Sequence, residues 1–438
     1  MADYVPSTSE ETADMLKALG MNDWKELYRD VPDIVFLSHK LDLPSGKSEM
    51  EVRSRMEEMA GKNKVYRAIL RGAGAYDHYI PSIVKSIPAK EEFLTAYTPY
   101  QAEMNQGLLQ SIFEYQTMIC DLTGMDVSNA SVYDGAVAAA EAAAMCRTGK
   151  KRAVLVSGAA DPNVISVMKT YCYGTGDELR IVPAKDGRTD PDALADMLSA
   201  GDVAGFYLQQ PNYFGLLEDA DKAGEMVHGQ KAMFIMGCNP IALAIMKTPG
   251  ECGADIAVGE GQPLGLPLAF GGPYLGYMAT TQKHFRKLPG RIVGQTTDKD
   301  GNRAYVLALQ AREQHIRREK ASSNICSNEA LCALTASVYM SVMGPEGMKK
   351  AASLSMSKAH YLASELCKVP GVSMKYEGPF FDEFATVMPK EEEVLSALDR
   401  KGILGGLPLE DGILWCATEK ASREILDETV LTVKEVLS

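Results

Sequence analysis

The chain has 438 residues and a net charge of −13, and 46% of its residues are hydrophobic and 24% charged. At about 150 residues per domain, this length predicts two to three domains, and the composition excludes disordered, collagen-like and coiled-coil classes. The acidic balance argues against a nucleic-acid partner, because neutralising phosphates requires a basic surface.

The cysteines, the histidines and the first residues carry no signal for a metal, a disulfide framework or a membrane. Nine cysteines are scattered without a CxxC or CxxH pair, and the six histidines are separate. The acidic residues 1–16 lack the apolar core of a signal peptide, and the longest nearly uncharged stretch, 256–282, is rich in Gly and Pro. We expect no metal site, no membrane association and a cytoplasmic location.

Up to residue 146, the patterns in the sequence predict helices. Short helices are predicted to start at Ser9 and to cover 50–60. Helical spacing then runs over 104–122, and the Ala-rich run 136–146 predicts a helix packed closely against another element.

From residue 153 onward, short apolar runs alternate with helical patterns. This alternation predicts an α/β fold with a mostly parallel, three-layer sheet whose ligands lie at the carboxyl ends of the strands. The predicted strands are 153–157, 179–183, 204–208, 232–236 and 255–258, and the helices between them are 162–172, 191–200 and 219–229.

The pattern changes after an apolar helix that ends at Gly344-Pro345, where short strands and helices follow one another. We therefore predict three parts: an N-terminal helical segment at 1–75, a large α/β domain at 76–344 and a small α+β C-terminal domain at 345–438.

Three segments are chemically distinctive, and each has a plain structural interpretation beside a functional one. The Gly- and Pro-rich stretch 259–273 is either a tight turn between strands or a loop shaped around a cofactor or a partner. Segment 312–320 has four fixed positive charges, which form either a solvated face or a clamp for carboxylate or phosphate. The aromatic and polar run 97–103, taken alone, suggests core packing with satisfied hydroxyls.

Taken together, three long segments resemble the P-protein family of the glycine cleavage system, in the form of its α subunit. They are YTPYQAEMNQ and its continuation at 97–142, GADIAVGEGQPLGLPLAFGGPYLGY at 253–277, and 290–331. The resemblance covers essentially the whole chain. It implies an aspartate aminotransferase-like fold, fold type I of the pyridoxal-phosphate-dependent transferases. It also implies a subunit that, with a β subunit, decarboxylates glycine and passes the aminomethyl group to the lipoyl arm of the H-protein. The expected assembly is a heterotetramer of two α and two β chains.

The same resemblance implies that the cofactor site of this chain is degenerate. Aligning the Gly-rich turn with that of the β-like half places the position of the aldimine lysine on Gln262, and no Lys or Arg occurs from 248 to 282. Asn239 follows the strand at whose end an Asp would face the pyridine nitrogen, and an amide cannot supply that charge. Asp134 at the start of the Ala-rich helix would oppose a phosphate. We expect pyridoxal phosphate on the β subunit and none bound covalently to this chain.

The functional residues of this chain are then expected to face the α/β interface, because dimers of this fold share their sites. The resemblance assigns no catalytic lysine and no proton donor here. The candidates near the partner's cofactor or the glycine are Tyr97, Thr98, Tyr100 and Gln101; those for carboxylate or phosphate contact are Arg312, His315, Arg317 and Arg318; and Asn324 is a candidate for completing the site.

Two alternatives remain open. One is a self-sufficient homodimeric pyridoxal-phosphate enzyme of the same fold, which would need a lysine at the strand-end turn. The other is a non-catalytic scaffold subunit that stabilises the β subunit and docks the H-protein.

Overall fold

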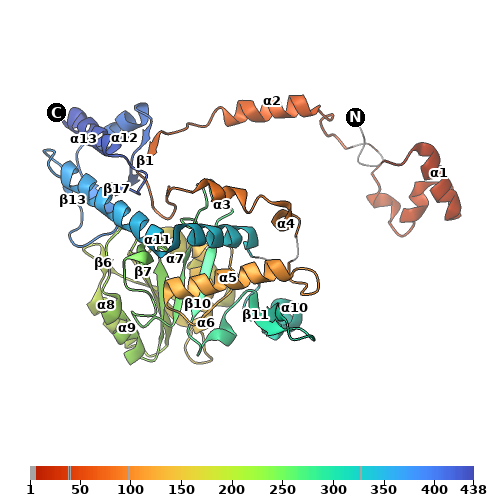
Figure 1. Ribbon diagram of the computed structural model, residues 1–438, viewed down its shortest axis with the longest axis horizontal. Helices are drawn as coiled ribbons and strands as arrows, with labels where there is room; N and C mark the ends of the chain where they lie inside the picture. The colour runs from red at the N-terminus through yellow and green to blue at the C-terminus, as the bar shows by residue number, and fades with distance from the viewer. Residues whose placement is uncertain (1–5, 38, 40, 97–98, 326–327) are drawn as a thin grey trace. The chain divides into compact units, whose positions relative to one another are not determined.

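The computed structural model describes residues 6–37, 39, 41–96, 99–325 and 328–438. It divides into two compact units, 1–65 and 66–438 (Figure 1). The three predicted domain boundaries remain predictions.

The first unit consists of short helices closed by side-chain caps. Thr8 caps helix α1 (Ser9–Ala18) by accepting from the Glu11 N–H, and the Glu11 carboxylate accepts in return from the Thr8 N–H. Ser48 caps α2 (Glu49–Ala60) in the same way. This reciprocal arrangement satisfies backbone donors that a helix leaves free at its start. Neither helix buries a residue within the unit.

The second unit is built on a seven-stranded sheet in the order β2-β10-β9-β8-β7-β3-β4. Strands β9, β8, β7, β3 and β4 are mutually parallel, whereas β10 runs antiparallel to both of its neighbours. The predicted mostly parallel sheet is therefore confirmed, although β10 was not predicted. The strands are β2 (Val127–Ser128), β3 (Ala153–Ser157), β4 (Leu179–Val182), β7 (Val203–Gln210), β8 (Met233–Cys238), β9 (Ile256–Glu260) and β10 (Gly276–Thr280).

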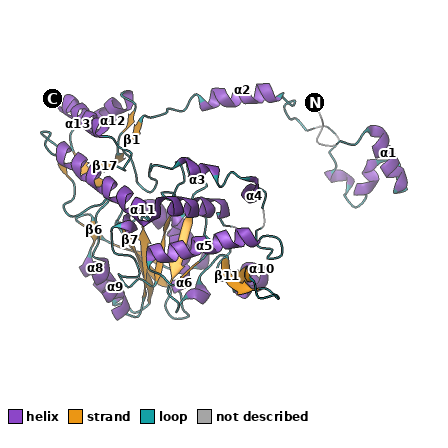
Figure 2. Ribbon diagram, viewed as in Figure 1, coloured by secondary structure: helices purple, strands orange, loops and turns teal. Residues whose placement is uncertain are grey.

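Helices cover both faces of this sheet and make the predicted three layers (Figure 2). Successive strand residues point to opposite faces: Leu155 packs with α5, α8, α9 and the first half of α11, whereas Val154 and Val156 pack with α6 and α7. The helices are α5 (Gln106–Thr123), α6 (Gly135–Cys146), α7 (Pro162–Thr175), α8 (Pro191–Leu198), α9 (Ala220–Gly229) and α11 (Ala330–Leu366).

Helix α11 is interrupted at Gly344, whose φ of 60° and ψ of 178° are not helical, directly before Pro345. The end of the helix, from Ala359 to Leu366, packs into another apolar core, which surrounds the fully buried Trp415. That core contains a four-stranded sheet in the order β13-β14-β17-β16 and a parallel pair of β1 with β15. Its elements are β1 (Ala68–Ile69), β13 (Ser373–Met374), β14 (Glu383–Val387), α12 (Glu391–Arg400), β15 (Ile403–Leu404), β16 (Leu407–Leu409), β17 (Gly412–Cys416) and α13 (Arg423–Leu437).

The remaining elements are short. A hairpin of β11 (Ile292–Thr297) and β12 (Arg303–Ala308) turns at Asp298, whose carboxylate accepts from two backbone N–H groups of the turn. Within the described part of the chain, no helix combines the length and the apolar character that a membrane span requires. The other short elements are α3 (Ser82–Ser86), α4 (Glu91–Leu94), β5 (Ala184–Lys185), β6 (Arg188–Thr189) and α10 (Gln314–Arg317).

Candidate functional site

A cavity of about 490 Å³ lies at the carboxyl ends of β3, β7, β8 and β9, which is the edge where the strand order predicts a ligand. The loop 73–76 and the start of β14 close it from the other side. Its most distinctive feature is acidity. The carboxylates among its lining residues are Asp134, Asp161, Glu260, Asp382 and Glu383.

Two of these carboxylates lie at the first turn of α6. Asp134 caps the helix by accepting from the Val137 N–H at 2.8 Å, and Glu260 accepts from the Gly135 N–H at 3.0 Å. A Cβ atom at Gly135 would lie 2.8 Å from the Glu260 backbone nitrogen, so the close approach of helix and strand requires glycine at 135. Helix N-termini in general attract anions. At the start of α6 this place is already taken by two carboxyl side chains of the chain itself.

Glu260 is held by three backbone donors. Besides Gly135, the N–H groups of Gln262 and Leu275 donate to it at 2.9 and 3.0 Å. Burial raises the pKa of its carboxyl to about 7; the three backbone bonds pull that pKa down, and the charge of Asp134 pushes it up. Glu260 therefore ties the loop after β9 to α6 and remains protonatable near neutral pH.

Three further carboxylates gather between α7 and β14. Asp161 caps α7 through the Asn163 N–H at 2.8 Å, and Glu383 accepts from the Ala73 N–H at 2.6 Å and from the Tyr76 hydroxyl at 2.7 Å. Asp382 is only 2% exposed, and its Oδ2 has no hydrogen-bond partner among the described residues. Burial, together with the adjacent charge of Glu383, raises the pKa of Asp382 well above its ordinary value.

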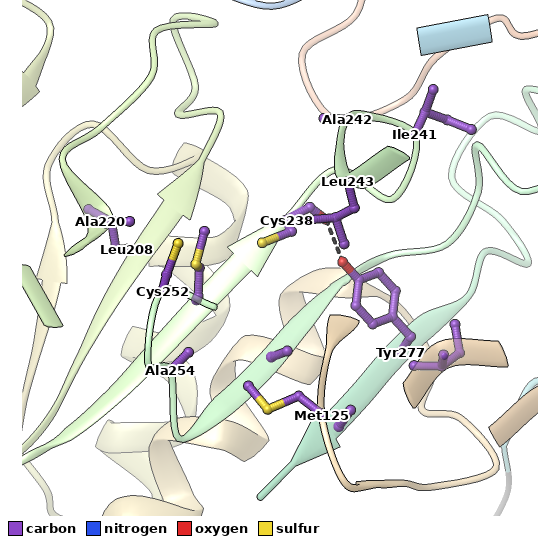
Figure 3. Close-up of a cluster of buried hydrophobic side chains, with 14 of the residues drawn as sticks. Met125, Leu208, Ala220, Cys238, Ile241, Ala242, Leu243, Cys252, Ala254 and Tyr277 are labelled. Carbon is purple, nitrogen blue, oxygen red and sulfur yellow. Dashed lines mark hydrogen bonds between the residues drawn. The ribbon is translucent and has the colours of Figure 1, made fainter. Parts of the chain in front are cut away.

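The end of β8 carries an amide and no acid. The Asn239 Oδ1 accepts from the Ile241 N–H at 2.9 Å and so turns the chain, while the Tyr277 hydroxyl donates to the Cys238 carbonyl at 2.7 Å (Figure 3). The close-up shows the Tyr277 ring, which comes from β10, reaching across to Cys238 at the end of β8; β9 lies between these two strands in the sheet. Asn239 lines the cavity without offering it a charge.

Gln262 has a structural role in the fold. Its side chain is 1% exposed and accepts from the Tyr76 N–H at 2.8 Å, and its Nε2 donates to the carbonyls of Tyr76 and Leu266 at 2.9 and 2.8 Å. Two of these hydrogen bonds fasten Tyr76 of the loop 73–76, and the third holds the Leu266 carbonyl. Of the three predicted degenerate-site residues, Asp134 and Asn239 line the cavity, and Gln262 lies behind it.

The cavity does not fit pyridoxal phosphate. The lining residues that the structure describes include neither Lys nor Arg, so there is no amine for an imine and no cation for a phosphate. Nor does the described part of the chain contain a group of three or more His, Cys, Asp or Glu side chains arranged to hold a metal ion.

A second charged cluster surrounds Glu313. Arg291 is paired with Glu313, and its guanidinium lies 5.0 Å from the centre of the Tyr100 ring. The His315 Nδ1 is 3.7 Å from the Glu313 Oε2, and Arg312 donates to the Gly290 carbonyl at 2.6 Å. Burial lowers the pKa of Arg312, and the charge of Glu313 partly offsets this. We call these residues the Glu313 cluster.

The structure therefore brings some of the predicted interface residues together and leaves others apart. Tyr100, Arg312 and His315 meet in the Glu313 cluster, whereas Gln101, Arg317, Arg318 and Asn324 are exposed. None of these seven lines the acidic cavity. Tyr97 and Thr98 lie outside the described residues.

The sequence analysis missed the residues that organise both places. Arg291 follows a Gly at the start of β11 and had no motif to mark it, and Glu313 was passed over within the basic segment. Only Glu260 had a sequence signal, since it lies in the Gly-rich loop. Asp161, Asp382 and Glu383 come from segments too distant in the chain for spacing to connect them.

Comparison with known proteins identifies the family of this chain. The chain matches the glycine cleavage system P-protein family over residues 2–430. It is 50% identical over 444 residues to a probable glycine dehydrogenase (decarboxylating) subunit 1 of Moorella thermoacetica, covering 99% of this chain and 100% of that one.

Solved structures confirm the predicted fold type I. A glycine decarboxylase (P-protein) of the glycine cleavage system, in inhibitor-bound form, has a TM-score of 0.93 and 41% identity, covering 99% of this chain and 100% of that one. A cysteine desulfurase from Thermococcus onnurineus, with a TM-score of 0.63 and 14% identity, covers 90% of this chain and 99% of that one and shows the fold alone.

Proposed function

This chain belongs to the glycine cleavage system P-protein family, and from that premise we propose that it works as the α subunit of a two-subunit, decarboxylating glycine dehydrogenase. Its partner is the β subunit, in a heterotetramer of two α and two β chains. The reaction removes the carboxylate of glycine and passes the aminomethyl group to the lipoyl arm of the H-protein. The proposed location is the cytoplasm.

The observation that carries the division of labour is the acidic cavity. At the sheet edge where this fold type would hold its cofactor, the chain places five carboxylates and no described Lys or Arg. Pyridoxal phosphate in the complex is therefore assigned to the β subunit, and this chain is inactive without it.

The contribution of this chain to the reaction is proposed to come from the Glu313 cluster. Arg291 neutralises Glu313 and so fixes the segment that carries Arg312 and His315. One amino group of Arg312 donates to the Gly290 carbonyl, and its buried Nε has no acceptor among the described residues. The guanidinium of the partly exposed Arg312 suits a carboxylate or phosphate group presented by the partner's site.

The assignment of the cofactor is tested on the purified full-length chain. We expect that added pyridoxal phosphate gives no visible aldimine band and that borohydride traps no specific lysine, whereas the complex with the β subunit gives both. A stoichiometric band on the α chain alone, with one lysine modified, would make this chain a catalyst in its own right and support the homodimeric alternative.

The Glu313 cluster is tested by Arg312→Lys and His315→Ala in the assembled complex. Loss of the guanidinium fork should lower glycine-dependent turnover by up to about a hundredfold, because small misplacements of a bound group are costly. His315→Ala should lower turnover while assembly stays intact. Arg423→Lys, in an exposed pair with Asp427, is the matched control. Unchanged turnover in both test variants would favour the scaffold alternative.

A further inference from the structure

The acidic cavity has the properties of a binding site for a ligand other than pyridoxal phosphate. We propose that it binds a small organic cation with at least two amino groups, of the diamine or polyamine class. This inference rests on the proposed function only in that the cavity must be free of the cofactor.

The first argument is uncompensated charge. The described residues that line the cavity include no Lys, Arg or His to balance its five carboxylates. Two buried carboxylates elsewhere in this unit have such partners: Glu313 has Arg291, and Glu419 has His78, whose Nδ1 lies 2.7 Å from the Glu419 Oε2. Burying a carboxylate without a cationic partner is costly and raises its pKa, as at Glu260, Asp382 and Glu383, and a cation bound from outside would offset this cost.

The second argument is an unused acceptor on a residue that lines the cavity. Asp382 is 98% buried and lines the space, yet its Oδ2 receives no hydrogen bond from any described residue. The neighbouring Glu383 is different, because Ala73 and Tyr76 each donate to one of its oxygens. The free Oδ2 of Asp382 is thus the natural acceptor for an ammonium N–H.

A third observation is the shape of the wall beside Asp161. Gly74 has a φ of +103°, and a Cβ atom built there would lie 2.9 Å from the Asp161 Oδ2. Any larger residue at 74 would press against this oxygen. The glycine therefore leaves the Asp161 carboxylate accessible to the cavity, on the same side as Asp382 and Glu383.

The distribution of the carboxylates favours more than one ammonium group. Asp161, Asp382 and Glu383 form one set between α7 and β14, and Asp134 with Glu260 forms another at the start of α6. The lining also contains Val164 and Val167 of α7, whose apolar side chains suit a methylene chain. A volume of about 490 Å³ lies within the range of about 300–1,000 Å³ usual for small-molecule sites.

The same chemistry excludes other ligand classes. An amino acid or a phosphate ester would bring an anion into a space without a lining cation. A metal ion would need three or more suitably arranged ligands, and the described residues contain no such group. A diamine satisfies both carboxylate sets and adds no anion.

The test uses the full-length, cofactor-free chain with putrescine and spermidine as probes, in calorimetric titration and thermal unfolding. We expect saturable binding of both amines and a rise in Tm. Succinate, glycine and magnesium at equal concentration should give neither. Absence of amine binding at millimolar concentration, or binding of magnesium in place of amine, overturns the proposal.

Two variants locate the site, and one serves as a control. Asp382→Asn and Asp161→Asn keep the side-chain volumes and should each weaken amine binding by about tenfold or more. Glu141→Gln is the control, because this carboxyl lies outside the cavity but is also buried, with 2% of the residue exposed and a pKa raised by burial to about 7. Its affinity for the amines should equal that of the wild type. Amine affinity equal to that of the wild type in both Asp variants overturns the proposal. If one variant fails to fold, the other variant and the comparison of amines with succinate, glycine and magnesium decide.

The outcome is separable from that of the proposed function. Borohydride trapping of pyridoxal phosphate on a lysine of this chain contradicts the cofactor assignment. Failure of amine binding without such trapping contradicts only the inference about the cavity.

Discussion

The acidic cavity and the Glu313 cluster are two charged regions of the same unit, built in opposite ways. In the cluster, a buried carboxylate is surrounded by Arg291, Arg312 and His315. In the cavity, Asp382 lies beside another carboxylate, Glu383, and has no cation among its described neighbours. A balanced buried charge holds its own segment in place, whereas an unbalanced one costs stability and is retained where a ligand uses it.

The largest expected effect breaks the balanced region. Glu313→Gln leaves Arg291, whose side chain is only 13% exposed, without a counter-charge and should lower the free energy of unfolding by roughly 3–5 kcal/mol. Urea denaturation measures this. The matched control is Asp427→Asn, which breaks the exposed pair with Arg423 and should cost about 0–1 kcal/mol. Equal losses in both would mean that the cluster is not a balanced buried site.

The next largest effect is a gain in the free energy of unfolding, and it concerns Asp382. The pKa of Asp382 is raised by burial, so its stabilising contribution is complete below its unfolded pKa and is lost as pH rises through the folded value. Asp382→Asn cannot ionise. The free energy of unfolding of this variant, relative to that of the wild type, should therefore rise with pH, by about 1.4 kcal/mol for each pKa unit of the shift. Denaturation below and above neutral pH measures the gain; a difference that does not grow with pH would contradict the like-charge description of this pair.

The smallest expected effect concerns Glu383, the neighbour of Asp382, which accepts hydrogen bonds on both of its oxygens. Tyr76→Phe removes the hydroxyl that donates to Glu383 at 2.7 Å and should cost about 1 kcal/mol of unfolding free energy. Because this bond lowers the pKa of Glu383, the loss should grow as pH rises. A parallel series with Tyr213→Phe, whose hydroxyl donates no hydrogen bond to a described carboxylate, separates this effect from the loss of a phenol. An equal loss at every pH would show that Glu383 does not ionise in the range tested.

The two regions also differ in how well the sequence predicted them. Segment 312–320 was visible as a run of charge, and the structure places His315 beside Glu313 and Arg312 on the Gly290 carbonyl, while its role as a clamp stays a prediction. The cavity was invisible as a set, because Asp161 follows β3 and Asp382 precedes β14, more than 200 residues apart. Only the closure of the fold brings such positions together.

The fold itself was predictable where periodicity is strong. The parallel strands and the capped helices were found within a few residues of their bounds. Strand β10 was missed because it follows a Gly-rich loop and its own residues show no apolar alternation. The hairpin β11–β12 was missed because its central turn was the only visible signal. The two-residue strands β1 and β15 are too short for any pattern, and pairing alone defines them.

The hydrogen bonds of the Gln262 side chain make a lysine at this position unfavourable. A lysine introduced at 262 could donate to the Tyr76 or Leu266 carbonyl, but it could not accept from the Tyr76 N–H as the amide does. It would also enter a space whose helix start already carries Asp134 and Glu260. A single substitution would therefore loosen the loop 73–76 without creating a place for an anionic cofactor. A site for such a cofactor would require several simultaneous changes, because the loop, the helix start and the strand end each contribute to the present arrangement.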